Sequence, residues 1–417
     1  MAVSNRCFYP GQLLLPREGT NLTAWACVAC DQFTSQPAYW EEVERLVGNQ
    51  PSAFRMILPE CWLNETDARV PGICRTMEQY LRDGTLVPAV QQGFILTERI
   101  TPSGARVGLV GMIDLECYDF HPEAKSLVRA SEGTIAERIP PRVRIREKAP
   151  LETSHVMLLM YDPMQSVVEP LFQKRRQLRK LYDFPLMMNG GQLIGYAVED
   201  AADIDGVYAA LERLRQGDDP MLFAVGDGNH SLATAKAIWD KVKPGLTPEE
   251  TMTHPARFAM VEIENIYDDA LRFEPIHRGL FGVDGDDLLD ELEAYAVRRG
   301  EDLIDPDATQ DIRVVYEGKE VTVSIPTPHR LAVGDLQTFL DEWLPAHPGA
   351  KMDYVHGEQA VRDLVKGEGA VGFLLPAPDK SRFFEQVREL GVLPRKTFSM
   401  GEAHDKRFYL EARKIRL

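Results

Sequence analysis

Residues 221–242 hold the feature that most constrains the fold, an apolar run followed by a polar turn and an alanine-rich segment. Residues 221–225 are all apolar, which is typical of a buried strand. Leu232, Ala235 and Trp239 recur on one stripe, which predicts a helix packed back against that strand. This order predicts an α/β arrangement whose turn lies at the end of a strand, where open sheets bind ligands.

The turn between these segments, residues 226–231, carries more functional groups than a simple connection needs. Two glycines flank its carboxylate, and glycine permits unusual backbone conformations or close approach of a ligand. The first amides of the helix are unpaired within the helix and carry its positive dipole end, which favours a phosphate or carboxylate. The candidate anion-binding residues are therefore Gly228, Asn229 and Ser231, and the candidate catalytic residues are Asp227 and His230. Asp227 is also the candidate metal ligand. The alternative for the whole segment is an ordinary turn in which Ser231 caps the helix.

Two other segments supply candidate site residues. The apolar run Trp25–Ala29 predicts a strand whose carboxyl end delivers Asp31, a further catalytic candidate, with a plain turn residue as the alternative. Arg142, Arg144 and Arg146 alternate with aliphatic residues after two prolines, and an extended strand would place the three guanidinium groups on one face. They are predicted either to bind a ligand phosphate or to pair with internal carboxylates.

These motifs, with Ala29–Gln32 and Leu393–Glu402, resemble an uncharacterised prokaryotic family, number 1015 in the domain-of-unknown-function series. The resemblance runs through most of the chain. Over a few residues, the turn also resembles the phosphate-binding motif of the ParB/sulfiredoxin superfamily, which includes nucleotide-dependent kinases of free serine. The family's usual turn is Asp-Gly-His-His-Arg, so Asn229 replaces a histidine and Ser231 replaces an arginine. Loss of that arginine removes a bidentate phosphate donor.

The expected fold class is α/β (mixed α+β). The resemblance implies a ParB/sulfiredoxin-like nucleotide-binding core with a smaller C-terminal α+β domain. A chain of 417 residues is longer than one core usually supports, and its composition shifts near residue 266. The predicted domains are therefore 1–266, which carries the turn, and 267–417.

The resemblance further implies a nucleotide, ATP or ADP, and Mg²⁺ as cofactors. The corresponding function is a nucleotide-dependent phosphotransferase acting on a small hydroxylated metabolite, with a free-serine kinase as the specific expectation. A non-catalytic protein that binds a nucleotide or an anionic metabolite is the alternative. Metal-dependent hydrolysis is a third hypothesis, but the sequence has no H-E-x-x-H motif that would favour it. The sequence also has no G-x-x-x-x-G-K motif, which excludes a P-loop as the nucleotide-binding element.

The amino-acid composition limits the classes of partner that the protein can bind. The net charge of -17 opposes nucleic-acid binding, which relies on basic surface to displace counterions. No apolar run approaches the length of a membrane span, and the N-terminus lacks a signal pattern, which predicts a soluble, cytoplasmic protein with a small-molecule substrate and no membrane partner. Cys27 and Cys30 form a C-x-x-C without a second pair, which favours reduced thiols in a buried strand over a metal site.

Overall fold

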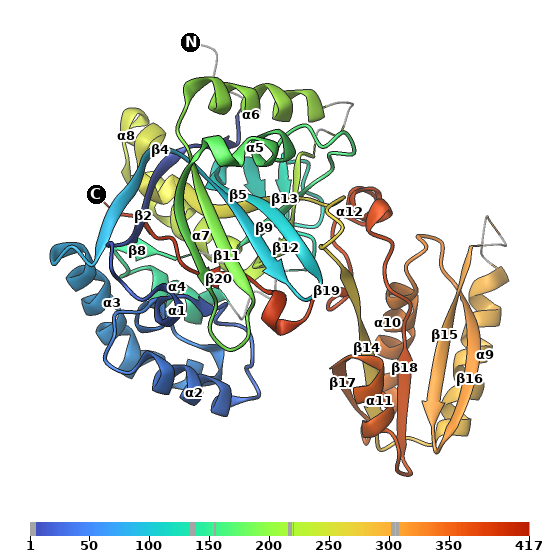
Figure 1. Ribbon diagram of the computed structural model, residues 1–417. Coiled ribbons are helices and arrows are strands. Elements are labelled where there is room, and N and C mark those ends of the chain that lie inside the picture. Colours follow the sequence, from blue (N-terminus) through green and yellow to red (C-terminus); the bar gives the residue numbers. More distant parts are fainter. Residues whose placement is uncertain are drawn as a thin grey trace. The chain divides into compact units, whose positions relative to one another are not determined.

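The computed structural model describes residues 6–133, 139–153, 156–215, 219, 221–301, 305 and 308–416. The chain forms two compact units (Figure 1). The first comprises Met1–Arg272 and Gly401–Leu417, and the second comprises Phe273–Met400. The expected division at residue 266 assigned the whole C-terminal segment to the second domain. The tail from Gly401 belongs to the first unit because its strands pair with strands there.

The first unit is built on an 11-stranded mixed sheet. Its strands are β1 (Phe8–Tyr9), β2 (Gly11–Pro16), β4 (Leu86–Thr101), β5 (Gly104–Asp114), β6 (Tyr118–Asp119), β7 (Val128–Arg129), β9 (Met157–Met160), β10 (Arg179–Pro185), β11 (Gln192–Val198), β12 (Phe223–Asp227) and β13 (Phe258–Asn265). Their order is β10-β11-β4-β5-β13-β9-β12-β7-β6, with β1 pairing β5 and β2 pairing β4. The pairs β13–β9, β12–β7 and β6–β7 are parallel, and the others are antiparallel.

Two small ladders attach the chain ends to this unit. Strand β20 (Phe408–Tyr409) pairs with β3 (Cys27–Val28), and β21 (Arg413–Lys414) pairs with β8 (Leu151–Glu152). Both ladders are antiparallel. The C-terminal tail is therefore joined by backbone hydrogen bonds to segments far away in the sequence.

Helices cover both faces of the large sheet (Figure 1). They are α1 (Leu22–Trp25), α2 (Pro37–Val47), α3 (Thr66–Arg82), α4 (Ile139–Arg146), α5 (Glu169–Gln173), α6 (Ala201–Leu214), α7 (Asn229–Val242) and α8 (Pro248–Thr253). One hydrophobic core joins α1, α2 and α3 to one face, and another joins α5, α6 and α7 to the other. Val110 and Leu109, neighbours on β5, belong to opposite cores, as the alternation of side chains along a strand requires.

The second unit is a 6-stranded antiparallel sheet with helices. Its strands are β14 (Phe273–Phe281), β15 (Thr309–Tyr316), β16 (Lys319–Pro326), β17 (Lys351–His356), β18 (Ala370–Leu374) and β19 (Phe398–Met400). Its helices are α9 (Gly285–Glu301), α10 (Ala332–Trp343), α11 (Glu358–Leu364) and α12 (Phe383–Leu390). The strand order is β16-β15-β18-β14-β17, with β19 pairing β14.

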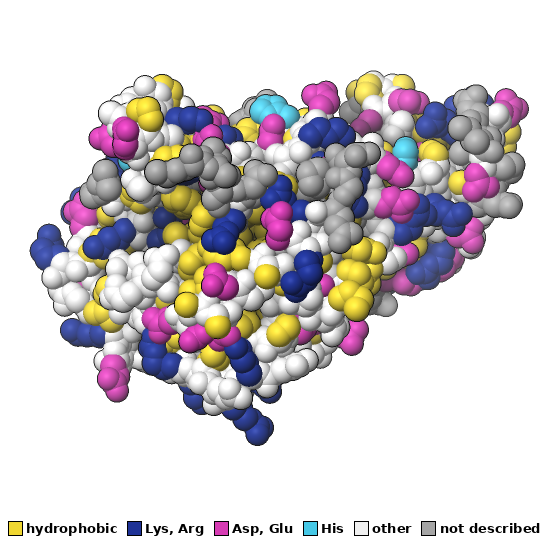
Figure 2. Space-filling model, turned by 90° about the horizontal axis from the view of Figure 1, so that it is seen from above, with side chains coloured by type: hydrophobic (Ala, Val, Ile, Leu, Met, Phe, Trp, Pro, Cys, Tyr) yellow, Lys and Arg dark blue, Asp and Glu magenta, His cyan; other side chains and the backbone are white. Residues whose placement is uncertain are grey.

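The surface carries charges of both signs. On the face drawn in Figure 2, basic and acidic side chains are interspersed rather than gathered into one region. Of the helices that the structure describes, none combines the length and the apolar character that a membrane span requires.

The mixed α/β fold class is confirmed, but the extended strand expected for the arginine run is wrong. Arg142, Arg144 and Arg146 lie in helix α4. Alternation over only five residues does not separate a strand from a short helix, and prolines are tolerated in the first turn of a helix. Helix α4 packs against α7 and α3, and this tertiary packing decides the conformation.

Candidate functional site

The junction of β12 and α7 has the strand, turn and helix that the sequence predicts. Strand β12 ends at Asp227, and Gly228 adopts a left-handed conformation with φ 85°. Helix α7 then begins at Asn229, and the Gly228 carbonyl accepts a hydrogen bond from the Leu232 amide at 3.0 Å. Because the cap residue is glycine, no side chain of its own caps this helix. The positive end of α7 thus begins directly beside the carboxylate of Asp227.

The Asp227 carboxylate lies between a backbone amide and a lysine ammonium group. Its Oδ1 accepts a hydrogen bond from the Gly228 amide at 3.0 Å. Its Oδ2 is buried, makes no hydrogen bond with the described residues and lies 3.4 Å from Nζ of Lys406. The two side chains are 15% and 8% exposed. An acidic oxygen held in this way retains the capacity to take a proton or a metal.

The other predicted residues of the turn have separate surroundings. The Asn229 side chain is bound to Ser131, since its Oδ1 accepts from the Ser131 amide and its Nδ2 donates to the Ser131 hydroxyl, both at 3.2 Å. His230 and Ser231 are half-buried on the first turn of α7. The His230 carbonyl accepts a hydrogen bond from the Thr234 hydroxyl at 2.7 Å. The amide side chain of Asn229 therefore fixes the turn to residue 131.

Asp31 lies in a half-buried turn that follows β3. Its Oδ1 accepts a hydrogen bond from Gln32 Nε2 at 3.1 Å. Burial raises the pKa of Tyr409 well above its usual value, and the neighbouring Cys30 and Asp31 raise it further. The Tyr409 hydroxyl lies 3.1 Å from Cys30 Sγ. Both predicted acids, Asp31 and Asp227, thus lie near the same tail segment, residues 406–409.

The three arginines of α4 lie beside carboxylates. Arg142 pairs with Glu60, and Arg146 pairs with Glu152 at 2.6 Å. Arg144 is exposed and lies 3.8 Å from Asp67. Internal ion pairs were one of the two alternatives for this run, and the pairs are present. They attach α4 to α3, to the segment before α3 that carries Glu60, and to β8.

A buried ionic cluster lies on the sheet face that also carries Asp227. Asp227 and Glu262 are both paired in register with Met157, so their side chains emerge on the same face. The ion pairs of this cluster join Arg407 to Glu262 and to Glu411, and Arg106 to Glu264. Burial raises the pKa of Glu264, so this carboxyl binds its proton more tightly than an exposed one.

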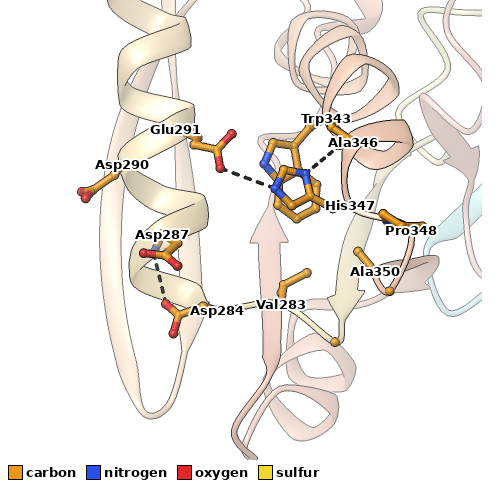
Figure 3. A pocket seen from close by; sticks show the side chains of 12 residues that line it. Val283, Asp284, Asp287, Asp290, Glu291, Trp343, Ala346, His347, Pro348 and Ala350 are labelled. Carbon is orange, nitrogen blue, oxygen red and sulfur yellow. Dashed lines mark hydrogen bonds and ion pairs between the residues drawn. The ribbon is translucent and has the colours of Figure 1, made fainter.

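A cavity of about 550 Å³ lies in the second unit, and none of the predicted site residues lines it (Figure 3). Figure 3 shows acidic side chains of α9 on one side and the stacked rings of Trp343 and His347 on the other. The ring centroids are 3.7 Å apart, and His347 Nε2 lies 3.7 Å from a Glu291 oxygen. Asp284 accepts hydrogen bonds from the amides of Asp286 and Asp287, so it caps the start of α9. The acidic residues at this helix start have a structural role.

The described residues contain no group of three His, Cys, Asp or Glu side chains placed to hold a metal ion. Mg²⁺ commonly keeps several waters and binds one or two carboxylates together with substrate phosphates. The single carboxylate of Asp227, with its Oδ2 lacking a hydrogen bond, fits a Mg²⁺ ion that arrives with a nucleotide. It does not form a site for a bare ion.

Sequence reasoning missed two residues of this site, Lys406 and Ser131. Lys406 is 175 to 180 residues away from the turn in sequence, because the whole second unit lies between them. A single lysine also gives no periodic signal. The adjacent pair Lys406-Arg407 directly before the apolar residues 408–410 was the signal available. Arg395 and Lys396, the two cations of the Leu393–Glu402 motif, are exposed in the second unit.

The fold and the junction define a two-unit mixed α/β protein with a glycine-capped helix start beside an Asp–Lys pair. The family model described as "Protein of unknown function (DUF1015)" matches residues 14–343, and the chain belongs to this family. This confirms the resemblance drawn from the turn and the flanking motifs. No curated protein sequence matches the chain.

Solved structures give matches of low similarity. A conserved hypothetical protein from Pyrococcus furiosus is 13% identical, with 73% of this chain and 94% of that chain covered and a TM-score of 0.35. A free serine kinase in complex with AMP is 14% identical, with 73% and 90% covered and a TM-score of 0.36. A C-terminally truncated SbnI from Staphylococcus aureus is 9% identical, with 72% and 82% covered and a TM-score of 0.33. Such TM-scores give no support to a functional assignment.

Proposed function

We propose that this protein is a nucleotide-dependent phosphotransferase that acts on a small hydroxylated metabolite, and that free serine is the first acceptor to test. The observation that carries the proposal is the start of α7, where a left-handed glycine, an uncapped helix end and the Asp227–Lys406 pair meet. Helix starts of this kind bind phosphate groups through their backbone amides. The motif resemblance to free-serine kinases supplies the acceptor class.

Each predicted residue has a proposed role. The amides from Gly228 to Ser231 bind the nucleotide phosphates, with His230 as a further donor. Asp227 is the protein ligand through which a phosphate-bound Mg²⁺ would offset negative charge. Asp31 accepts the proton of the acceptor hydroxyl. We assign the three arginines of α4 to positioning that helix, because each lies beside a carboxylate.

The reaction conserves atoms and charge. The hydroxyl oxygen of the acceptor forms a bond to the terminal phosphorus while the bond from that phosphorus to the leaving nucleotide phosphate breaks. The hydroxyl proton passes to the Asp31 carboxylate. Positioning and electrostatic stabilisation account for most of the catalysis in phosphoryl transfer.

A non-catalytic binding protein is the second candidate. Ser231 stands where the family motif usually has arginine, and a bidentate phosphate donor is absent from that position. A protein that senses a nucleotide or an anionic metabolite needs the binding site but not the alignment of an acceptor. This candidate and the phosphotransferase share the same phosphate site.

The two candidates are separated by binding and turnover measurements on the full chain. Thermal-shift and calorimetric titrations with ATP, ADP and CTP, with and without Mg²⁺, measure selective stabilisation. Phosphate transfer to serine and to other hydroxyl compounds is then followed with any nucleotide that binds. Binding with transfer supports the phosphotransferase, and binding without transfer supports the sensor. Absence of nucleotide binding at millimolar concentration contradicts the phosphotransferase and a nucleotide sensor, and leaves only a sensor of another anionic metabolite.

The Asp227→Ala variant tests the site directly. Loss of the proposed metal ligand is expected to lower turnover by about 10²–10⁴-fold. Activity is measured at a temperature where the variant is fully folded, because the largely buried Lys406 loses its ion pair. Asp240→Ala is the matched control, because Asp240 is an exposed residue of α7 that pairs with Lys236. Equal activity of the two variants would remove Asp227 from the site.

A further inference from the structure

A phosphate that binds at the start of α7 needs a nearby cation. The net charge of -17 gives an unfavourable overall field for an anion, so a local positive group has to compensate. The arginine usual in the family motif is replaced by Ser231. The arginines of α4 are paired with Glu60, Glu152 and Asp67. Another cation therefore has to face the turn.

Lys406 is placed at this position by the returning tail. The Ala29 amide donates a hydrogen bond to the Arg407 carbonyl at 2.9 Å, and Arg106 Nη1 donates to the Asp405 carbonyl at 3.2 Å. The backbone on both sides of Lys406 is thus fixed. Arg407 is anchored further by its ion pairs with Glu262 and Glu411. The position of the Lys406 side chain beside Asp227 is a consequence of these contacts.

The ammonium group of Lys406 has spare donor capacity. It carries three N–H groups. Its ion pair with the described residues is the one with Asp227 Oδ2, at 3.4 Å, and this contact does not meet hydrogen-bond geometry. Lys406 is nevertheless 8% exposed, so the charge has been largely removed from water. A desolvated ammonium with unused donors binds an additional anion favourably.

Asp227 occupies the place of an anion in this arrangement. One oxygen contacts the Gly228 amide and the other lies next to Lys406, so the carboxylate spans the first amide of the turn and the ammonium. A phosphate oxygen can make the same two contacts. Binding of a phosphate with its Mg²⁺ would leave Lys406 on the phosphate and Asp227 on the metal.

We infer that Lys406 is a phosphate-binding residue of this site and replaces the arginine missing at position 231. The inference rests on the proposed function, since it concerns the same nucleotide site. Lys406 contacts the phosphates and not the base or ribose. Its contribution is therefore confined to ligands that carry phosphate.

The test compares phosphorylated and unphosphorylated ligands by calorimetry on the full chain. Lys406→Met is expected to weaken ADP and pyrophosphate binding at least about tenfold in the presence of Mg²⁺, because a charge-assisted hydrogen bond is lost. The affinity for adenosine should be unchanged. Lys406→Arg should retain ADP affinity within about threefold, since the charge and donors remain. Lys406→Gln, a neutral donor, serves in place of the methionine variant if that protein does not fold.

Two controls separate phosphate binding from other roles. Lys241→Met removes the same charge from an exposed lysine of α7 paired with Glu147 and should leave ADP affinity unchanged. In the double variant Asp227→Asn/Lys406→Met the unpaired carboxylate is also removed, and ADP binding should stay weak. Recovery of ADP binding in the double variant would show that Lys406 only neutralises Asp227, which overturns the inference.

The remaining outcomes are also decisive. Wild-type ADP affinity in Lys406→Met would overturn the inference while leaving the proposed function intact. A wild-type protein that binds neither ADP nor pyrophosphate would overturn both. An equal loss of adenosine and ADP affinity would assign Lys406 to general structure and contradict a phosphate contact.

Discussion

Two ion-pair networks, one from each unit, differ in how far their side chains are exposed to solvent. In the first, Arg407 pairs with Glu262 and Glu411, and the three side chains are at most 5% exposed. In the second, Glu358 pairs with Arg313 and Arg362, and these side chains are 32–41% exposed. Buried charges persist only when they are well paired, whereas exposed pairs contribute little. The Arg407 cluster is therefore held rigidly in the tail segment that carries Lys406, whereas the Glu358 network is left to the solvent.

The largest effect is expected from breaking the buried cluster. Arg407→Met leaves Glu262 and Glu411 buried without their cation, which should lower the unfolding free energy of the first unit by about 3–5 kcal/mol. Urea unfolding measures the loss. Adding Glu262→Gln and Glu411→Gln to the same variant should restore part of the stability, because the uncompensated charges are removed. A loss below about 1 kcal/mol for Arg407→Met would contradict the expectation that the buried ion pairs of the first unit contribute more to stability than the exposed pairs of the second.

A pH titration tests the buried imidazole of the second unit. Burial lowers the pKa of His277 to about 4, and its Nδ1 accepts a hydrogen bond from the Leu375 amide at 3.1 Å. Between about pH 6.5 and 4 the unfolded chain binds a proton that the folded unit does not. Stability should therefore be fully present above about pH 6.5 and fall by at most about 3 kcal/mol as the pH drops to about 4.

Denaturant unfolding at several pH values, compared with His277→Gln, isolates this contribution. The comparison is needed because burial raises the pKa of Asp335 in the same unit to about 6, which acts in the opposite direction over this range. The glutamine variant should show a flatter loss of stability toward acid pH. Parallel profiles of the two proteins would contradict a depressed His277 pKa.

Two left-handed glycines, one from each unit, give a matched pair of smaller effect. Gly228 has φ 85° in the turn before α7, and Gly318 has φ 76° in the β15–β16 hairpin, where a β-carbon would meet open space. Alanine at either position should cost about 1–2 kcal/mol through backbone strain. Only Gly228→Ala should also weaken ADP binding in calorimetry. Equal ADP affinity of the two variants would argue against phosphate binding at this turn.

The smallest effect is expected at the exposed network. Arg313→Met should change the unfolding free energy of the second unit by less than about 1 kcal/mol, because its pairs with Glu358 and Glu320 are solvated. The difference should shrink further in about 1 M salt, where exposed charges are screened. Urea unfolding at low and high salt measures both quantities. A loss comparable with that of Arg407→Met would show that exposure does not distinguish the units.

Local patterns predicted much of the fold. The apolar run before Asp227 and the stripe of Leu232, Ala235 and Trp239 predicted the correct strand and helix, because a polar turn bounds the run and the stripe extends over two helical turns. The run at Arg142–Arg146 failed because five alternating residues fit a strand and a short helix equally well. Its ion pairs with Glu60 and Glu152 depend on tertiary packing that no local pattern contains.

The site was predictable only where its residues are adjacent in sequence. Asp227, Gly228 and His230 could be read from one turn. Lys406 could not, since its approach to Asp227 depends on the pairing of β20 with β3 across most of the chain. Long-range strand pairing of this kind is set by the whole fold and leaves no signature in a short window.

The return of the tail to the first unit has a consequence for biosynthesis. Strands β20 and β21 are translated only after every residue of the second unit, whereas the segments that they pair with emerge among the first 152 residues. Domains that fold during synthesis usually do so in order from the N-terminus. Here the first unit cannot complete its β3 and β8 ladders, or bring Lys406 to Asp227, until the second unit has been translated.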